Sequence, residues 1–140
     1  MLQLFGFASY IAAAVIISYS DIKYRIIRNS DLAVFLLFGI FFNASDYTLK
    51  NFQFLLVVSL ICISLHLAFS GKIGAGDLKL FWVLIFWVLN FTKWLEGVTL
   101  AWILGGVFAL VFLGVTGRGR QRNFSIPFAP FIFLGFLPAI

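Results

Sequence analysis

The stretch GVTLAWILGGVFALVFLGVT, residues 97–116, contains no charged residue and decides the fold class. A helix needs roughly 17–25 mainly apolar residues to cross a bilayer, and this run has that length. Five further apolar runs occur near residues 2–20, 31–49, 52–70, 78–95 and 124–140. The runs are continuous and show no period of two, which disfavours the alternating strands of a barrel. The sequence therefore predicts an all-α, polytopic membrane bundle of about six transmembrane helices.

The amino-acid composition also indicates a membrane protein. Of 140 residues, 63% are hydrophobic and 11% are charged, and the mean hydropathy is +1.09. Soluble domains are about 25% charged, so this chain cannot surround a water-soluble core. We expect residues 1–140 to form a single membrane-embedded domain. The first apolar run has no basic residue before it, so we interpret it as a retained span rather than a cleavable leader.

The basic residues alternate between the predicted loops. Eight of the ten Lys and Arg residues fall in the first, third and fifth gaps: Lys23, Arg25, Arg28, Lys72, Lys79, Arg118, Arg120 and Arg122. The positive-inside rule then places the odd-numbered loops in the cytoplasm and both termini outside. We interpret the net charge of +5 as a topology signal. Nucleic-acid binding is not expected, because no loop is long enough to build a basic face outside the lipid.

Two aspartates lie at predicted cytoplasmic ends of spans. Asp21 ends the first apolar run, and Asp77 follows two glycines, Gly74 and Gly76, just before the fourth. Acids at a membrane are costly and mark functional sites by default, although a hydrated loop end is an open alternative for Asp21. Two glycines in three residues are expected where the chain turns tightly or where something approaches closely, such as a peptide substrate. A capped turn is the alternative for Asp77.

The other acids have simpler explanations. We expect Asp31 to cap the second helix, and we place Asp46 and Glu96 in outer loops across the membrane from the two candidates. Cys62 is the only cysteine, so an intrachain disulfide and zinc sites with paired cysteines are excluded, and we interpret it as apolar filler. Cys62 and His66 share a helix face, but two ligands are too few for a metal site. We therefore predict no metal and expect His66 to be buried between helices.

Two carboxylates at one low-dielectric site suit a specific reaction. Close like charges disfavour double ionisation, so one acid keeps its proton while the other is ionised. The ionised acid can take a proton from an attacking water, and the protonated acid can hydrogen-bond the peptide carbonyl. This chemistry is aspartic proteolysis, and it needs no cofactor. The alternatives are a non-catalytic assembly scaffold, or a small ion channel or transporter component, in which acids nearer mid-membrane would be expected.

Three stretches resemble the type IV prepilin peptidase family, of the small Flp (tight-adherence) type, within the Gly-x-Gly-Asp membrane aspartic proteases. They are Asp21 to Asn29, the sequence Gly74-Ala75-Gly76-Asp77-Leu78-Lys79-Leu80, and Ile126-Pro127-Phe128-Ala129-Pro130. The second matches the family's Gly-x-Gly-Asp-x-Lys-Leu in full. Arg28 stands where the family favours proline, and Ala129 where it favours glycine. Neither is expected to touch a catalytic atom.

The resemblance implies that Asp21 and Asp77 cut the leader peptide from prepilins at the cytoplasmic face of the inner membrane. It further implies motif or substrate-positioning roles for a second group of residues: Gly74, Gly76, Lys79, Asn29, Pro127 and Pro130. The expected partners are a prepilin-like protein and the bilayer, although an archaeal preflagellin-like substrate fits the same residues. The N-terminal cysteine-bearing segment of the bifunctional members has no counterpart here, so the resemblance does not extend to their methylation activity.

Lys79 lies two positions after Asp77, and this spacing points the two side chains in different directions on a helix. A direct ion pair between them is therefore not expected. Its place in the motif suggests that Lys79, or Lys72, steadies an acidic residue of the incoming substrate.

Overall fold

Six α-helices make up most of the described chain in the computed structural model, which describes residues 2–69, 74–116 and 126–140. The helices are α1 (Leu2–Tyr24), α2 (Asn29–Phe42), α3 (Leu49–Ala68), α4 (Ala75–Val83), α5 (Phe91–Thr116) and α6 (Ala129–Phe136). Short 3₁₀ turns follow α2, α4 and α6: η1 (Ala44–Asp46), η2 (Leu84–Phe86) and η4 (Leu137–Ala139). These residues include no strand, so the predicted helical membrane bundle is confirmed.

Three of these helices are long and apolar enough to cross a membrane by length and composition. The spans run over Gln3–Tyr24, Leu49–Ala68 and Phe91–Val115. The helix α2 has 14 residues, α4 has 9 and α6 has 8, each below the length of a full span. The described residues contain six α-helices, one for each predicted apolar run, but the expectation that every run forms a full-length span is wrong. Lys72, Arg118, Arg120 and Arg122 of the predicted loops lie outside the described residues.

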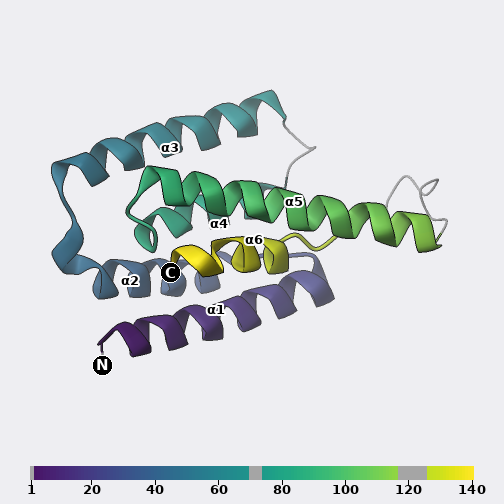
Figure 1. Ribbon diagram of the computed structural model, residues 1–140, viewed down its shortest axis with the longest axis horizontal. Helices are drawn as coiled ribbons and strands as arrows, with labels where there is room; N and C mark the ends of the chain where they lie inside the picture. The colour runs from purple at the N-terminus through teal and green to yellow at the C-terminus, as the bar shows by residue number, and fades with distance from the viewer. Residues whose placement is uncertain (1, 70–73, 117–125) are drawn as a thin grey trace.

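The helices lie roughly alongside one another, with α1 and α3 at opposite sides of the bundle (Figure 1). The helix α5 packs along α6, and α1 contacts both α2 and α6. The helix α4 packs against α2, α3 and α6. The C-terminal half of α5 extends past the ends of its neighbours (Figure 1).

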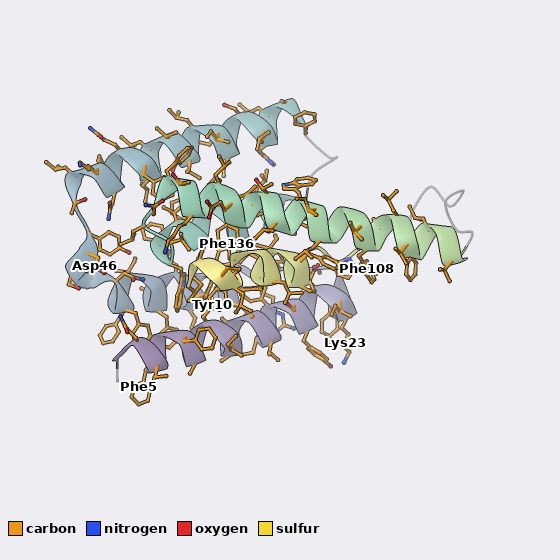
Figure 2. The ribbon with its side chains drawn as sticks, in the orientation of Figure 1. Phe5, Tyr10, Lys23, Asp46, Phe108 and Phe136 are labelled. Atoms are coloured by element: carbon orange, nitrogen blue, oxygen red, sulfur yellow. The ribbon has the colours of Figure 1, made fainter. Side chains whose placement is uncertain are left out.

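Aromatic side chains join these helices in the core. The rings of Phe35 and Trp87 stack with centroids 4.9 Å apart, and Tyr10 and Phe133 meet them edge-on or tilted. The Tyr10 hydroxyl donates a 2.8 Å hydrogen bond to the carbonyl of Phe133. This carbonyl belongs to the last turn of α6, where helical carbonyls lose their partners along the chain. Figure 2 shows Tyr10 and Phe136 in the middle of the bundle.

The predicted span 78–95 is not one helix. It ends as α4 at Val83, continues as η2, and restarts as α5 at Phe91. Contacts with α2 and with Asn43, the residue that follows it, hold this break. The ring of Trp87 lies against Gly39 and its indole N–H donates to the Phe35 carbonyl at 3.0 Å, while the Asn43 side chain donates to the Phe86 carbonyl at 3.1 Å. Backbone groups freed by a helix break inside a membrane protein are satisfied by neighbouring helices in this way.

The predicted cap at Asp31 is also wrong. The helix α2 begins at Asn29 after Arg28, and no side chain caps it. Asp31 instead sits in the first turn, where a negative charge still suits the helix dipole.

Candidate active site

Asp21 lies in the last turn of α1 and is 7% exposed. Its Oδ2 atom accepts a 3.0 Å hydrogen bond from the backbone N–H of Ala129, the first residue of α6. The first amides of a helix have no partner within the helix, and their partial positive charge attracts anions. One end of α6 therefore satisfies the carboxyl group of Asp21, 108 residues earlier in the chain.

This contact explains part of the third stretch of the resemblance, Ile126 to Pro130. Pro130 occupies the first turn of α6, where a missing N–H costs nothing, and Pro127 lies just before the helix. We expected Ala129 not to touch a candidate catalytic atom, and this expectation is wrong, because its amide contacts Asp21. The contact is made by the backbone N–H of Ala129, and the identity of a side chain does not predict a contact of the backbone.

The chain turns sharply one helical turn after Asp21. The helix α1 ends at Tyr24, and Arg25 adopts a left-handed conformation with φ of 56°. The buried Ser20 hydroxyl donates to the Ile26 carbonyl at 3.0 Å and closes the turn. This turn carries Ile27 and Asn29 toward α4.

Asp77 lies in the first turn of α4, and both glycines of its motif have a steric role. A Cβ atom on Gly74 would lie 2.7 Å from Oδ2 of Asp77, which is closer than real Cβ contacts. A Cβ atom on Gly76 would lie 3.1 Å from the Cβ of Ile27. Gly74 therefore leaves room for the Asp77 carboxyl group, and Gly76 allows the turn after Asp21 to approach α4.

The two carboxyl groups interact electrostatically. Burial and, as the smaller cause, the charge of Asp21 together raise the pKa of Asp77 from 3.8 to about 6. Asp77 lies on α4, outside the three helices that can span the membrane. An effect of one acid on the other requires that they share one poorly solvated region. Asp21 on α1 and Asp77 on α4 therefore lie close enough for the charge of Asp21 to act on Asp77.

Lys79 and Asn29 also meet in the structure. The Lys79 ammonium donates a 3.0 Å hydrogen bond to Oδ1 of Asn29 at the start of α2. As expected, Lys79 does not point at Asp77. The first and second stretches of the resemblance are therefore joined by this hydrogen bond and by the approach of Ile27 to Gly76.

A largely apolar cavity of about 420 Å³ opens beside Asp77. It is lined by residues of α3, α4 and α5 together with Phe128: Ile61, Cys62, Leu65, Gly74, Asp77, Leu78, Phe81, Phe91, Trp94, Leu95, Val98, Trp102 and Phe128. Phe128 directly precedes Ala129, so this wall adjoins the group that holds Asp21. Sequence reasoning missed Trp94 and Trp102, because nothing in the sequence distinguishes them from other aromatic residues in apolar runs.

The structure also places the other polar residues singled out in the sequence. Asp46 lies in η1, at the opposite end of the bundle from Lys23 (Figure 2), and Glu96 lies on α5. His66 is exposed, so the expectation that it is buried between helices is wrong. Cys62 is half-buried, with Sγ 4.0 Å from the Leu78 carbonyl. The described residues contain no group of three or more His, Cys, Asp or Glu side chains that could hold a metal ion.

A family model decides the class of this protein. The model of the type IV leader peptidase family matches residues 8–110, which is most of the chain. The chain belongs to the type IV leader peptidase family. The matched segment includes Asp21, Asn29 and the Gly74 to Lys79 motif, while Pro127 and Pro130 lie beyond it. Comparisons with curated proteins and with solved structures gave no match.

Membership identifies the chain as a leader peptidase-type protease. Together with the three helices that can span a bilayer, it identifies an integral membrane protein.

Proposed function

We propose that this chain is an aspartic endopeptidase that cleaves the leader peptide of Flp-type type IV prepilins. The observation that carries the proposal is the shared site of Asp21 and Asp77, in which one charge raises the pKa of the other acid. Two acids on separate helices, each partly removed from water, are the group that aspartic proteolysis requires.

We assign the proton of the pair to Asp77, because burial raises its pKa to about 6. A substrate that covers the site removes more water and raises this pKa again. Asp21 then acts as the base: its carboxylate takes a proton from water while the water oxygen bonds to the peptide carbonyl carbon. Asp77 hydrogen-bonds the carbonyl oxygen as negative charge develops there. Collapse of this intermediate breaks the C–N bond, and the departing nitrogen takes up the proton that Asp21 accepted from water, which restores the Asp21 carboxylate.

The cavity beside Asp77 supports an apolar substrate segment next to the cleaved bond. Its volume of about 420 Å³ lies within the range of roughly 300–1,000 Å³ found for small ligand sites, and its walls are mainly aromatic and aliphatic. Cleavage of a protein at the point where a polar leader meets an apolar segment would place that segment against these walls. No cofactor is needed for this chemistry.

The proposed location is the inner membrane, with the acids at the cytoplasmic face and both termini outside. The end of α1 that carries Asp21 supports this orientation. The Lys23 ammonium lies 5.4 Å and 5.2 Å from the ring centroids of Tyr19 and Tyr24. Basic residues mark the cytoplasmic side of membrane helices, and tyrosines mark the interface. We further propose that the chain forms a single peptidase domain, since its helices share one apolar core.

Co-expression with a Flp-type prepilin tests the proposal. We expect wild-type enzyme to shorten the prepilin, and Asp21→Asn and Asp77→Asn each to abolish processing while the protein still accumulates in the membrane. Asp46→Asn is the matched control, because it removes the same charge at the opposite end of the bundle. Processing that survives both single substitutions would rule out the dyad and favour a scaffold or transport role. Cleavage of a preflagellin-like protein but not of the prepilin would keep the mechanism and change the substrate.

A further inference from the structure

The two candidate acids depend on an indirect connection for their relative position. Asp21 is on α1 and Asp77 is on α4, and α4 packs against α2, α3 and α6. Two routes therefore link the position of Asp21 to that of Asp77: the Ala129 amide of α6, which binds Asp21, and the turn between α1 and α2. Whatever fastens this turn to α4 contributes to the separation of the two carboxyl groups.

Two contacts hold the turn between α1 and α2 against α4, one on each side of Asp77 in the sequence. Ile27 packs against Gly76, where a Cβ atom would lie only 3.1 Å from the Cβ of Ile27. Asn29 accepts the 3.0 Å hydrogen bond from Lys79. We refer to these four residues, Ile27, Asn29, Gly76 and Lys79, as the clasp. The ammonium makes this a charge-assisted hydrogen bond, formed between two exposed side chains.

We propose that Lys79 and Asn29 are positioning residues, whose hydrogen bond holds the Asp77 turn of α4 against the turn that follows Asp21. This inference rests on the proposed peptidase function. It differs from a role of Lys79 toward the substrate, because it assigns the Lys79 ammonium a partner within the chain. Catalysis is sensitive to such support, since a misplacement of about 1 Å far from the chemistry can lower the rate about a hundredfold.

The test is a double-mutant cycle with Lys79→Met and Asn29→Leu, measured as prepilin cleavage by purified full-length enzyme in detergent micelles. Each single substitution removes one partner of the hydrogen bond at similar side-chain size. We expect each to lower kcat about 10- to 100-fold with little change in KM, and the double variant to be no slower than the slower single variant. Asn29→Asp should retain activity, because its carboxylate still accepts from Lys79. Lys50→Met is the control for loss of an exposed lysine and should leave kcat unchanged.

The pH profile separates positioning from a general loss of structure. As the acids move apart, Asp21 repels the Asp77 carboxylate less, so the pKa of Asp77 falls. Because Asp77 must be protonated to act, the alkaline limb of the kcat profile shifts to lower pH. The proposal would be overturned if the losses of kcat in the two single variants multiplied in the double variant and the pH profile did not shift. Loss of activity with Lys79→Met but not with Asn29→Leu would instead assign Lys79 to the substrate. Wild-type enzyme that fails to cleave the prepilin would refute the proposed function rather than the clasp.

Discussion

Two adjacent glycines of α5 give a sharp test of the site architecture. A Cβ atom on Gly105 would fall against the ring of Phe128, with Cδ2 at 2.9 Å and Cζ at 3.3 Å, whereas a Cβ atom on Gly106 would meet nothing within 4 Å. Phe128 lines the cavity beside Asp77 and directly precedes the amide that binds Asp21. Gly105→Ala should therefore disturb the site, and Gly106→Ala should not.

The contacts of the ring set the magnitude. To restore ordinary carbon contacts of about 3.5–4.0 Å, the Phe128 ring must move by about 1 Å. The ring also packs on Trp102, with centroids 5.2 Å apart. Overpacking of this kind costs about 1–3 kcal/mol, while Ala gains up to about 1 kcal/mol over Gly within a helix. Both variants gain the same helix propensity from Ala, so this term cancels between them. Gly105→Ala should therefore be about 1–3 kcal/mol less stable than Gly106→Ala.

The measurement combines unfolding in detergent micelles with prepilin cleavage. We expect Gly105→Ala to lower kcat about tenfold, because Phe128 displaces the amide that holds Asp21. Adding Phe128→Leu to Gly105→Ala should recover stability relative to Gly105→Ala alone, since the smaller side chain removes the collision. Equal stability and equal activity of the two alanine variants would refute this reasoning, because it would show that Phe128 does not rest on Gly105.

Three further predictions concern stability. Because the pKa of Asp77 is raised in the folded protein from 3.8 to about 6, the folded state binds the proton more tightly. The unfolding free energy should therefore decrease by at most about 3 kcal/mol as pH rises through this interval, and Asp77→Asn should flatten that slope in pH-dependent denaturation. Tyr10→Phe leaves the buried Phe133 carbonyl without its 2.8 Å donor and should cost about 1–3 kcal/mol in denaturant unfolding; an unchanged midpoint would contradict this. Arg25 has φ of 56°, so Arg25→Gly should be more stable than Arg25→Ala by about 1 kcal/mol in thermal unfolding, and the reverse order would argue against a left-handed residue there.

Sequence reasoning predicted the helices better than their lengths. The apolar runs identify helices because a chain in lipid must satisfy its own backbone hydrogen bonds. The run 78–95 nevertheless breaks near Phe86 and Trp87, where Asn43 and Phe35 of distant segments form hydrogen bonds with it. Apolar content alone does not reveal such a break, because the donors and acceptors that stabilise it come from another helix.

The candidate site was likewise predicted only in part from the sequence. By itself the sequence determined the membrane setting, the helical class and the short motifs that contain Asp21 and Asp77, because length, charge and residue identity are properties of the chain. Only the tertiary structure decided that the Ala129 amide binds Asp21, that Lys79 turns to Asn29, and that an aromatic cavity adjoins Asp77. These depend on distances between segments 50 to 108 residues apart, which are set by helix packing and not by local sequence.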